Sequence, residues 1–154
     1  MSILTGKLEG ELEVSASAEK FYEVVCNKPT LLSTVVCPDL IPACDLLDGQ
    51  WGILGSITQW TYVLGGEAKV AKMILESADS TNNSVTYRVL EGDLMLQFSL
   101  FSAKFTITPK EVGSLVSLTL DYIKLGLGVD PPQAMLELAI QVFKLLDAYL
   151  INQA

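Results

Sequence analysis

The chain has 154 residues, the size of one domain; half are hydrophobic and 18% are charged, which argues against intrinsic disorder. Its formal net charge of −8 disfavours binding to nucleic acids and to anionic membrane surfaces. It contains no histidine, which excludes Ser–His and Cys–His nucleophiles and disfavours a catalytic zinc site. We therefore expect no nucleic-acid partner, no metal and no cofactor.

Three further features of the sequence concern the cellular compartment of the protein. No run of 18 apolar residues is present, so we expect no membrane span. The opening "MSILTGKLEG" lacks the basic and apolar regions of a signal peptide, which favours a cytoplasmic protein. The cysteines, Cys26, Cys37 and Cys44, are odd in number, and we expect free thiols in a reducing compartment.

The first elements are a strand and two short helices. Leu8, Leu12 and Val14 share one parity while charged residues take the other, which predicts a half-buried strand. The following "SASAEKFYEVVCN" begins with serines that can cap a helix. "KPTLLSTVV" predicts a second short helix with Pro29 in its first turn.

Residues 40–124 predict six strands separated by short polar or glycine-containing gaps. Most gaps have hairpin length, so the sheet should be antiparallel. The glycine-rich stretch "DGQWGILGSI" is not a phosphate-binding loop, because Gly55 is followed by Ser56 rather than lysine and the next segment is strand-like. We expect a glycine turn between two strands.

A long helix ends the predicted order. We expect Asp130 to cap it, Pro131 to occupy its first position, and the rest of its surface to be apolar apart from one polar stripe. A single long antiparallel sheet must curl, and this helix is the element able to cover its concave face. The sequence thus predicts an α+β fold, one domain over residues 1–154, and a cavity between sheet and helix.

Alternation along the strands and periodicity along the helix identify side chains that face this cavity. The candidate ligand-binding residues are Trp60, Tyr62, Val70, Lys72, Val85, Tyr87, Phe101, Leu120, Tyr122, Leu138 and Val142. For each, the alternative is an ordinary core residue; for Lys72, a β-bulge would turn the side chain outward. We name Lys72 and Tyr87 as candidate catalytic residues, because an ammonium can stabilise an enolate-like oxygen and a hydroxyl can polarise a carbonyl.

Opposite parity predicts a surface feature on the strand that begins at Leu94. There Leu96, Phe98 and Leu100 point away from the cavity and form an exposed apolar patch. Such a patch is typical of an interface, so a homodimer through these residues is one prediction. The alternative is that a loop or a neighbouring helix covers them.

Five segments in order resemble one plant family: "AEKFYEV" (18–24), "GQWGILGSI" (49–57), "AKVAK" (68–72), "EGDLM" (91–95) and "DAYL" (147–150). They are similar to the major latex proteins of the birch-pollen-allergen superfamily, which includes the pathogenesis-related class ten proteins. The resemblance covers essentially the whole chain. It implies a helix-grip fold, in which a seven-stranded antiparallel sheet grips a long C-terminal helix and two short helices close one end.

The resemblance also implies a hydrophobic plant metabolite in the cavity, and a minority of the family are cyclases or isomerases. This chain departs from the family pattern at Met73, where glutamate is usual, in its lack of histidine, and in the apolar stretch after "GDLM". These departures favour an apolar, terpenoid-like ligand. Three functions stay open: a cofactor-independent cyclase or isomerase for an activated intermediate such as an iridoid precursor, a non-catalytic carrier or sensor in defence and stress, and an interaction protein.

Overall fold

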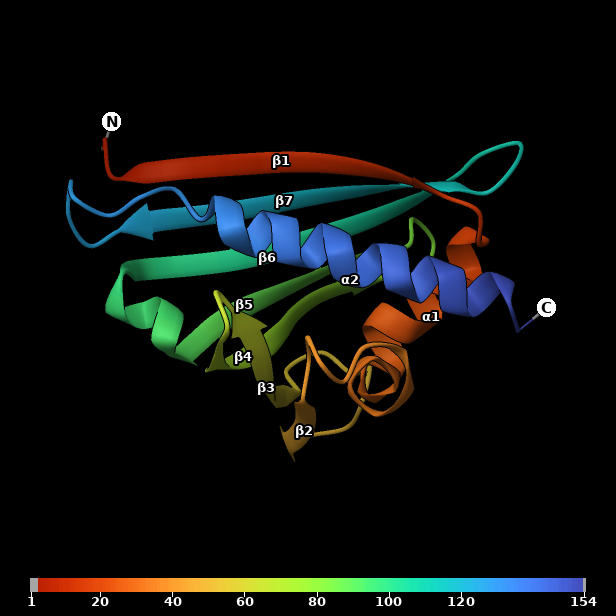
Figure 1. The fold of residues 1–154 in the computed structure, drawn as a ribbon, viewed down its shortest axis with the longest axis horizontal. Helices are drawn as coiled ribbons and strands as arrows, with labels where there is room; N and C mark the ends of the chain where they lie inside the picture. The colour runs from red at the N-terminus through yellow and green to blue at the C-terminus, as the bar shows by residue number, and fades with distance from the viewer. Residues whose placement is uncertain (1–2, 154) are drawn as a thin grey trace.

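A computed structural model describes residues 3–153; Met1, Ser2 and Ala154, included in the predicted domain, lie outside the described residues. One antiparallel sheet in the order β1-β7-β6-β5-β4-β3-β2 curls around helix α2 (Gln133–Ile151) (Figure 1). Its strands are β1 (Thr5–Val14), β2 (Ala43–Asp48), β3 (Ile57–Leu64), β4 (Glu67–Asp79), β5 (Ser84–Gly92), β6 (Phe98–Pro109) and β7 (Ser114–Lys124). The predicted α+β helix-grip fold is confirmed.

Two short helical segments connect β1 to β2, as predicted. Helix α1 (Ala18–Asn27) begins after Ser17, whose hydroxyl accepts a hydrogen bond from the Lys20 amide. The second segment, η1 (Leu32–Val36), is one π-helical turn. In Figure 1 both lie at the end of the molecule that holds the C-terminal end of α2.

The glycine-rich stretch forms the connection between β2 and β3. Gly49, Gly52 and Gly55 all have positive φ, between 76° and 86°. A β-carbon at Gly52 would overlap the Asn27 Oδ1 at the end of α1, so this close approach requires glycine. The predicted glycine turn is confirmed, and Gly52 packs against the end of α1.

Helix α2 begins later than predicted. Asp130 is not its cap: the cap position is Pro132, the first helical residue is Gln133, and no side chain caps the end. The residue before a proline is displaced from helical geometry, so Pro131 cannot begin a helix ahead of Pro132. The polar stripe of the helix is exposed as expected. No helix within residues 3–153 is long and apolar enough to span a membrane.

The predicted apolar patch on β6 is wrong at its centre. Phe98 is 2% exposed and packs edge-on against Phe101, with 5.3 Å between ring centroids. The cause is a 3-10 turn, η2 (Asp93–Leu96), followed by a register shift between Phe98 and Leu100 that reverses the parity. Leu96 and Leu100 remain exposed, so the proposed homodimer surface loses its central residue.

Candidate ligand cavity

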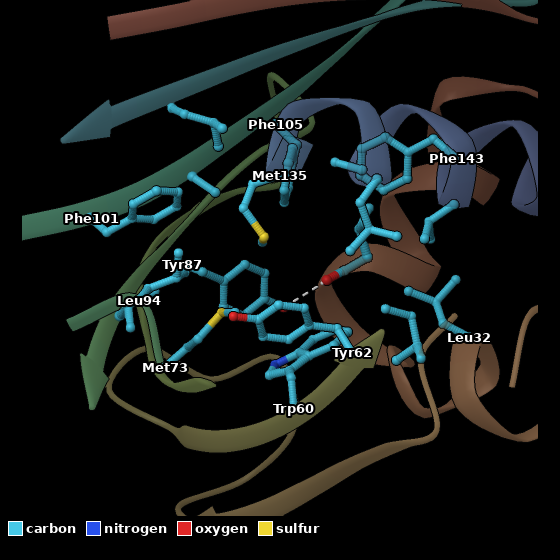
Figure 2. A pocket seen from close by; sticks show the side chains of 18 residues that line it. Leu32, Trp60, Tyr62, Met73, Tyr87, Leu94, Phe101, Phe105, Met135 and Phe143 are labelled. Carbon is cyan, nitrogen blue, oxygen red and sulfur yellow. Dashed lines mark hydrogen bonds between the residues drawn. The ribbon is translucent and has the colours of Figure 1, made fainter. Parts of the chain in front are cut away.

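A cavity of about 120 Å³ lies between the concave face of the sheet, α2 and the two short helical segments (Figure 2). Every lining residue is aliphatic, aromatic or a methionine, and within residues 3–153 no charged side chain lines it. The lining residues are Val25, Leu32, Ile41, Trp60, Tyr62, Met73, Tyr87, Val89, Leu94, Phe101, Ala103, Phe105, Leu120, Met135, Leu138, Ala139, Val142 and Phe143.

Strand pairing explains why these side chains converge. Trp60 on β3 pairs with Ala71 on β4, and Met73 on β4 pairs with Val89 on β5. Directly paired residues of an antiparallel sheet point to the same face. The even residues of β3 and the odd residues of β4 therefore form the concave face.

This register corrects the predicted orientation of Lys72 and Val70. Lys72 lies between Ala71 and Met73, so it points to the outer face, where its Nζ lies 2.9 Å from a carboxylate oxygen of Glu91. Val70 shares that outer face and is half-buried there. Apolar residues occupy both parities of β4, so alternation could not identify the inner one. Lys72 has no access to the cavity from this position.

Seven of the predicted ligand-binding residues do line the cavity: Trp60, Tyr62, Tyr87, Phe101, Leu120, Leu138 and Val142. Two others are buried elsewhere in the core. Val85 is fully buried. Tyr122 packs against the Phe98 ring at 5.5 Å and occupies the space that a β-carbon at Gly6 would need. Contact of any of these residues with a ligand remains a prediction.

Several lining residues escaped the sequence prediction. Met135 and Phe143 lie on the same face of α2 as Leu138 and Val142, so helical periodicity could have identified them. Leu94 could not have been found that way, because it sits in a 3-10 turn that interrupts the strand pattern. Phe143 packs edge-on against Phe21 and Phe105, at 5.4 and 5.0 Å between ring centroids.

Three residues of the cavity lining carry a polar side-chain nitrogen or oxygen, and two of these atoms have hydrogen-bond partners. The indole nitrogen of Trp60 donates to the Thr58 hydroxyl at 2.9 Å. The Tyr87 hydroxyl donates to the Val25 carbonyl at 2.6 Å. Burial raises the pKa of Tyr87, so its hydroxyl stays protonated and committed to that carbonyl.

The third polar atom is the Tyr62 hydroxyl. It is the one buried side-chain nitrogen or oxygen without a hydrogen-bond partner among the described residues, on a residue that is only 3% exposed. Burial, with the negative charge of Asp93 adding to it, raises the pKa of Tyr62 to about 12. The Tyr62 hydroxyl therefore stays protonated at neutral pH and keeps the capacity to donate one hydrogen bond.

The three cysteines are free thiols, and all are buried. Burial raises the pKa of Cys37 to about 11 and, together with the Asp45 charge, that of Cys44 to about 12. Thiols of such high pKa are not nucleophiles at neutral pH. Cys37 and Cys44 are therefore structural.

A family comparison matches the whole described chain. The model of the pathogenesis-related protein Bet v 1 family covers residues 3–153. The chain belongs to the Bet v 1 family. Within that family it is similar to the major latex-like proteins, as the ordered segments predicted.

Curated relatives from Arabidopsis thaliana are similar over the full chain. MLP-like protein 28 is 41% identical over 99% of this chain and 46% of its own length; MLP-like protein 34 is 42% identical over 97% and 48%. The chain thus spans about half the length of these two relatives. MLP-like protein 43 is 39% identical, and the match covers 97% of it.

Two solved structures share the fold. The crystal structure of major latex-like protein 151 from Panax ginseng superposes with a TM-score of 0.91 at 30% identity, covering 95% of this chain and 97% of that one. The solution structure of an Arabidopsis thaliana member of the major latex protein family gives a TM-score of 0.71 at 41% identity, with 98% and 97% covered.

Proposed function

We propose that this protein binds a small, neutral, hydrophobic plant metabolite in the cavity between sheet and α2. The observation that carries the proposal is the Tyr62 hydroxyl, which is buried and without a partner. Burying an unpaired hydroxyl is unfavourable, so a site that retains one has a use for it when it is filled. The ligand would place one oxygen atom against Tyr62 and its hydrocarbon part against the surrounding apolar side chains.

The chemistry of the lining narrows the class of ligand. A carboxylate or an ammonium group would lose its hydration with no opposite charge to replace it, because no charged side chain lines the cavity in the described chain. A polyhydroxylated molecule would leave most of its hydroxyls unpaired. A terpenoid-like ketone, aldehyde or alcohol suits a single hydroxyl within an apolar wall.

The test compares two ligands that differ in one atom. Cyclohexanone and methylenecyclohexane have the same shape, but only the ketone accepts a hydrogen bond. Tyr62→Phe should weaken binding of cyclohexanone by about fivefold, the worth of about 1 kcal/mol for one hydrogen bond, and leave methylenecyclohexane unaffected. Protein-observed NMR titration measures both affinities.

Tyr87→Phe is the matched control, since it removes a hydroxyl that is already bonded to the Val25 carbonyl. It should leave the preference between the two ligands unchanged. Equal losses of cyclohexanone affinity in Tyr62→Phe and Tyr87→Phe, or no loss in either, would contradict the role of Tyr62.

A second candidate is guided cyclisation or isomerisation of an activated intermediate such as an iridoid precursor. Supporting it are a cavity without charged groups and one hydroxyl that can donate to a developing oxyanion. The predicted catalytic pair loses support, because Lys72 is ion-paired outside the cavity and the Tyr87 hydroxyl is occupied. Tyr62 would carry the polarising role instead.

Incubation with a reactive dialdehyde enol, followed by chiral gas chromatography, separates this candidate from a non-catalytic carrier or sensor in defence and stress. A catalyst changes the product ratio, and Tyr62→Phe returns it to the uncatalysed value. An unchanged ratio with intact binding supports the carrier. We propose a cytoplasmic location for either role, supported by three cysteines that remain free thiols.

A further inference from the structure

A second pocket lies next to the cavity at the N-terminal end of α2. Its volume is about 280 Å³. It is formed by the end of β3, by η2 and the start of β6, and by the connection between β7 and α2. Gln97, Gly128, Asp130 and Ala134 in its wall are exposed, so this outer pocket opens at the surface.

Two residues, Leu94 and Met135, line both the cavity and the outer pocket. They therefore stand between the two spaces. In Figure 2 the Met135 side chain extends from α2 into the cavity, toward the rings of Tyr62 and Tyr87. An unbranched thioether with three rotatable bonds changes conformation at little cost in energy.

The cavity alone is small for a metabolite. Ligand pockets for metabolite-sized molecules have volumes of about 300–1,000 Å³. The cavity of about 120 Å³ is smaller than that range, and only its combination with the outer pocket of about 280 Å³ reaches it. Displacing Met135 would join them without any change in the sheet.

The local structure of α2 permits this displacement. Its first turn has no side-chain cap, and the preceding segment contains Gly126 and Gly128, at both of which a β-carbon would meet open space. Its C-terminal half is fixed, because the Asp147 carboxylate accepts hydrogen bonds from the Ser15 and Ala16 amides. Movement is therefore cheaper at the end that carries Met135.

We propose that Met135, with Leu94, forms a movable partition that admits ligands from the outer pocket and selects those with a slender apolar tail. The oxygen end of the ligand lies at Tyr62 in the cavity and the tail passes the partition into the outer pocket. This inference rests on the proposed function. It adds the route of entry, the shape of the ligand and the residue that controls both.

The test uses straight-chain primary alcohols from hexanol to dodecanol, which displace the neutral fluorophore 1-aminoanthracene. In the unmodified chain, affinity should rise by about fourfold for each added methylene across the series, because the tail continues into the outer pocket. A plateau at the short alcohols that fill only the cavity would overturn the proposal.

Three variants then test whether Met135 controls the entry of ligands. Met135→Ala should raise the association rate of the fluorophore by about tenfold, since entry no longer waits for the side chain to move. Met135→Ile keeps the apolar bulk but stiffens the first rotatable bond, so it should slow association and abolish the gain with chain length. Met95→Ala, which removes a half-buried methionine that lines neither the cavity nor the outer pocket, should leave the association rate within about twofold.

The outcomes separate the two proposals. Intact binding with the same rates in all variants, or an equal acceleration by Met95→Ala, would overturn the partition and leave the proposed function standing. Absence of binding by every alcohol and by the fluorophore would overturn the proposed function and the partition together. Met135→Ile retains a packed side chain, so the rate test does not depend on the fold of the alanine variant.

Discussion

The two ends of helix α2 are held in different ways. At the C-terminal end the Asp147 carboxylate accepts hydrogen bonds from the Ser15 amide at 3.0 Å and the Ala16 amide at 2.8 Å. Phe143 packs against Phe21 at the same end. At the N-terminal end no side chain caps the helix, and Met135 has empty space on two sides. In Figure 1 these are the ends at α1 and at the β7–α2 connection.

This difference shows how one fold provides both stability and access. Densely packed aromatic rings and charge-assisted hydrogen bonds contribute to the free energy of unfolding, and empty space does not. A helix fixed at one end and loosely packed at the other keeps the sheet gripped while it leaves a route to the interior. The C-terminal end should therefore dominate stability and the N-terminal end should dominate ligand exchange.

The largest effect expected from this comparison is at Phe21. The side chain is completely buried at the α1 end, so Phe21→Ala should lower the free energy of unfolding by about 3–5 kcal/mol. Met135→Ala, at the loosely packed end, should cost on the order of 1 kcal/mol. Urea denaturation measures both. Equal losses would show that the two ends are packed alike.

Asp147 provides the next test. Asp147→Ala removes the charged acceptor of two backbone amides and should cost about 2–3 kcal/mol. Amide hydrogen exchange at Ser15 and Ala16 should accelerate in parallel. Glu137→Ala, which removes an exposed carboxylate from the polar stripe of the same helix, should change stability by less than about 0.5 kcal/mol. An Asp147 effect no larger than the Glu137 effect would mean that the C-terminal end is not fixed in this way.

The pH dependence of the unfolding free energy tests whether water reaches the Tyr62 hydroxyl. An unfolded tyrosine loses its proton near pH 10, whereas Tyr62 in the folded chain keeps it to about pH 12. The folded state binds more protons between these values, so this contribution is complete below pH 10 and is lost as the pH rises to 12. Its slope is at most about 1.4 kcal/mol per pH unit.

Tyr62→Phe should therefore make the fall in unfolding free energy between pH 10 and 12 shallower by the share due to Tyr62, measured by urea denaturation at each pH. The share due to Tyr87, whose pKa burial also raises, should remain. Tyr149→Phe removes a half-exposed tyrosine at the other end of α2. In this variant the share of the fall in unfolding free energy that is due to Tyr62 should persist. Parallel declines in Tyr62→Phe and the unmodified chain would mean that water reaches Tyr62 through the loosely packed end.

The fold was predictable because its signals are local and repeated. Hairpin-length gaps fix antiparallel pairing, and the apolar surface of α2 fixes which element the sheet must cover. The errors have equally local causes. Pro131 is followed by a second proline, which delays the helix, and a 3-10 turn with a register shift brings Phe98 inside.

The candidate site was predictable only where one face of a strand is clearly more apolar than the other. In β5 the inward residues alternate cleanly, and Tyr87 was placed correctly. In β4 both faces carry apolar residues, so parity could not choose between Lys72 and Met73. No sequence pattern could show that the Tyr62 hydroxyl lacks a partner while that of Tyr87 has one, because the Val25 carbonyl is 62 positions away in the chain.

The smallest expected effect tests that correction of β4 directly. Lys72 and its partner Glu91 are 34% and 69% exposed, and exposed ion pairs contribute about 0–1 kcal/mol. Lys72→Met should therefore change stability little and leave cyclohexanone affinity unchanged, and Glu91→Gln should do the same. If Lys72→Met alone weakened cyclohexanone binding, the ammonium group would have to reach the cavity. Because Met73 precludes that in the observed register, such a result would require a one-residue shift of β4 and would exchange its inner and outer faces.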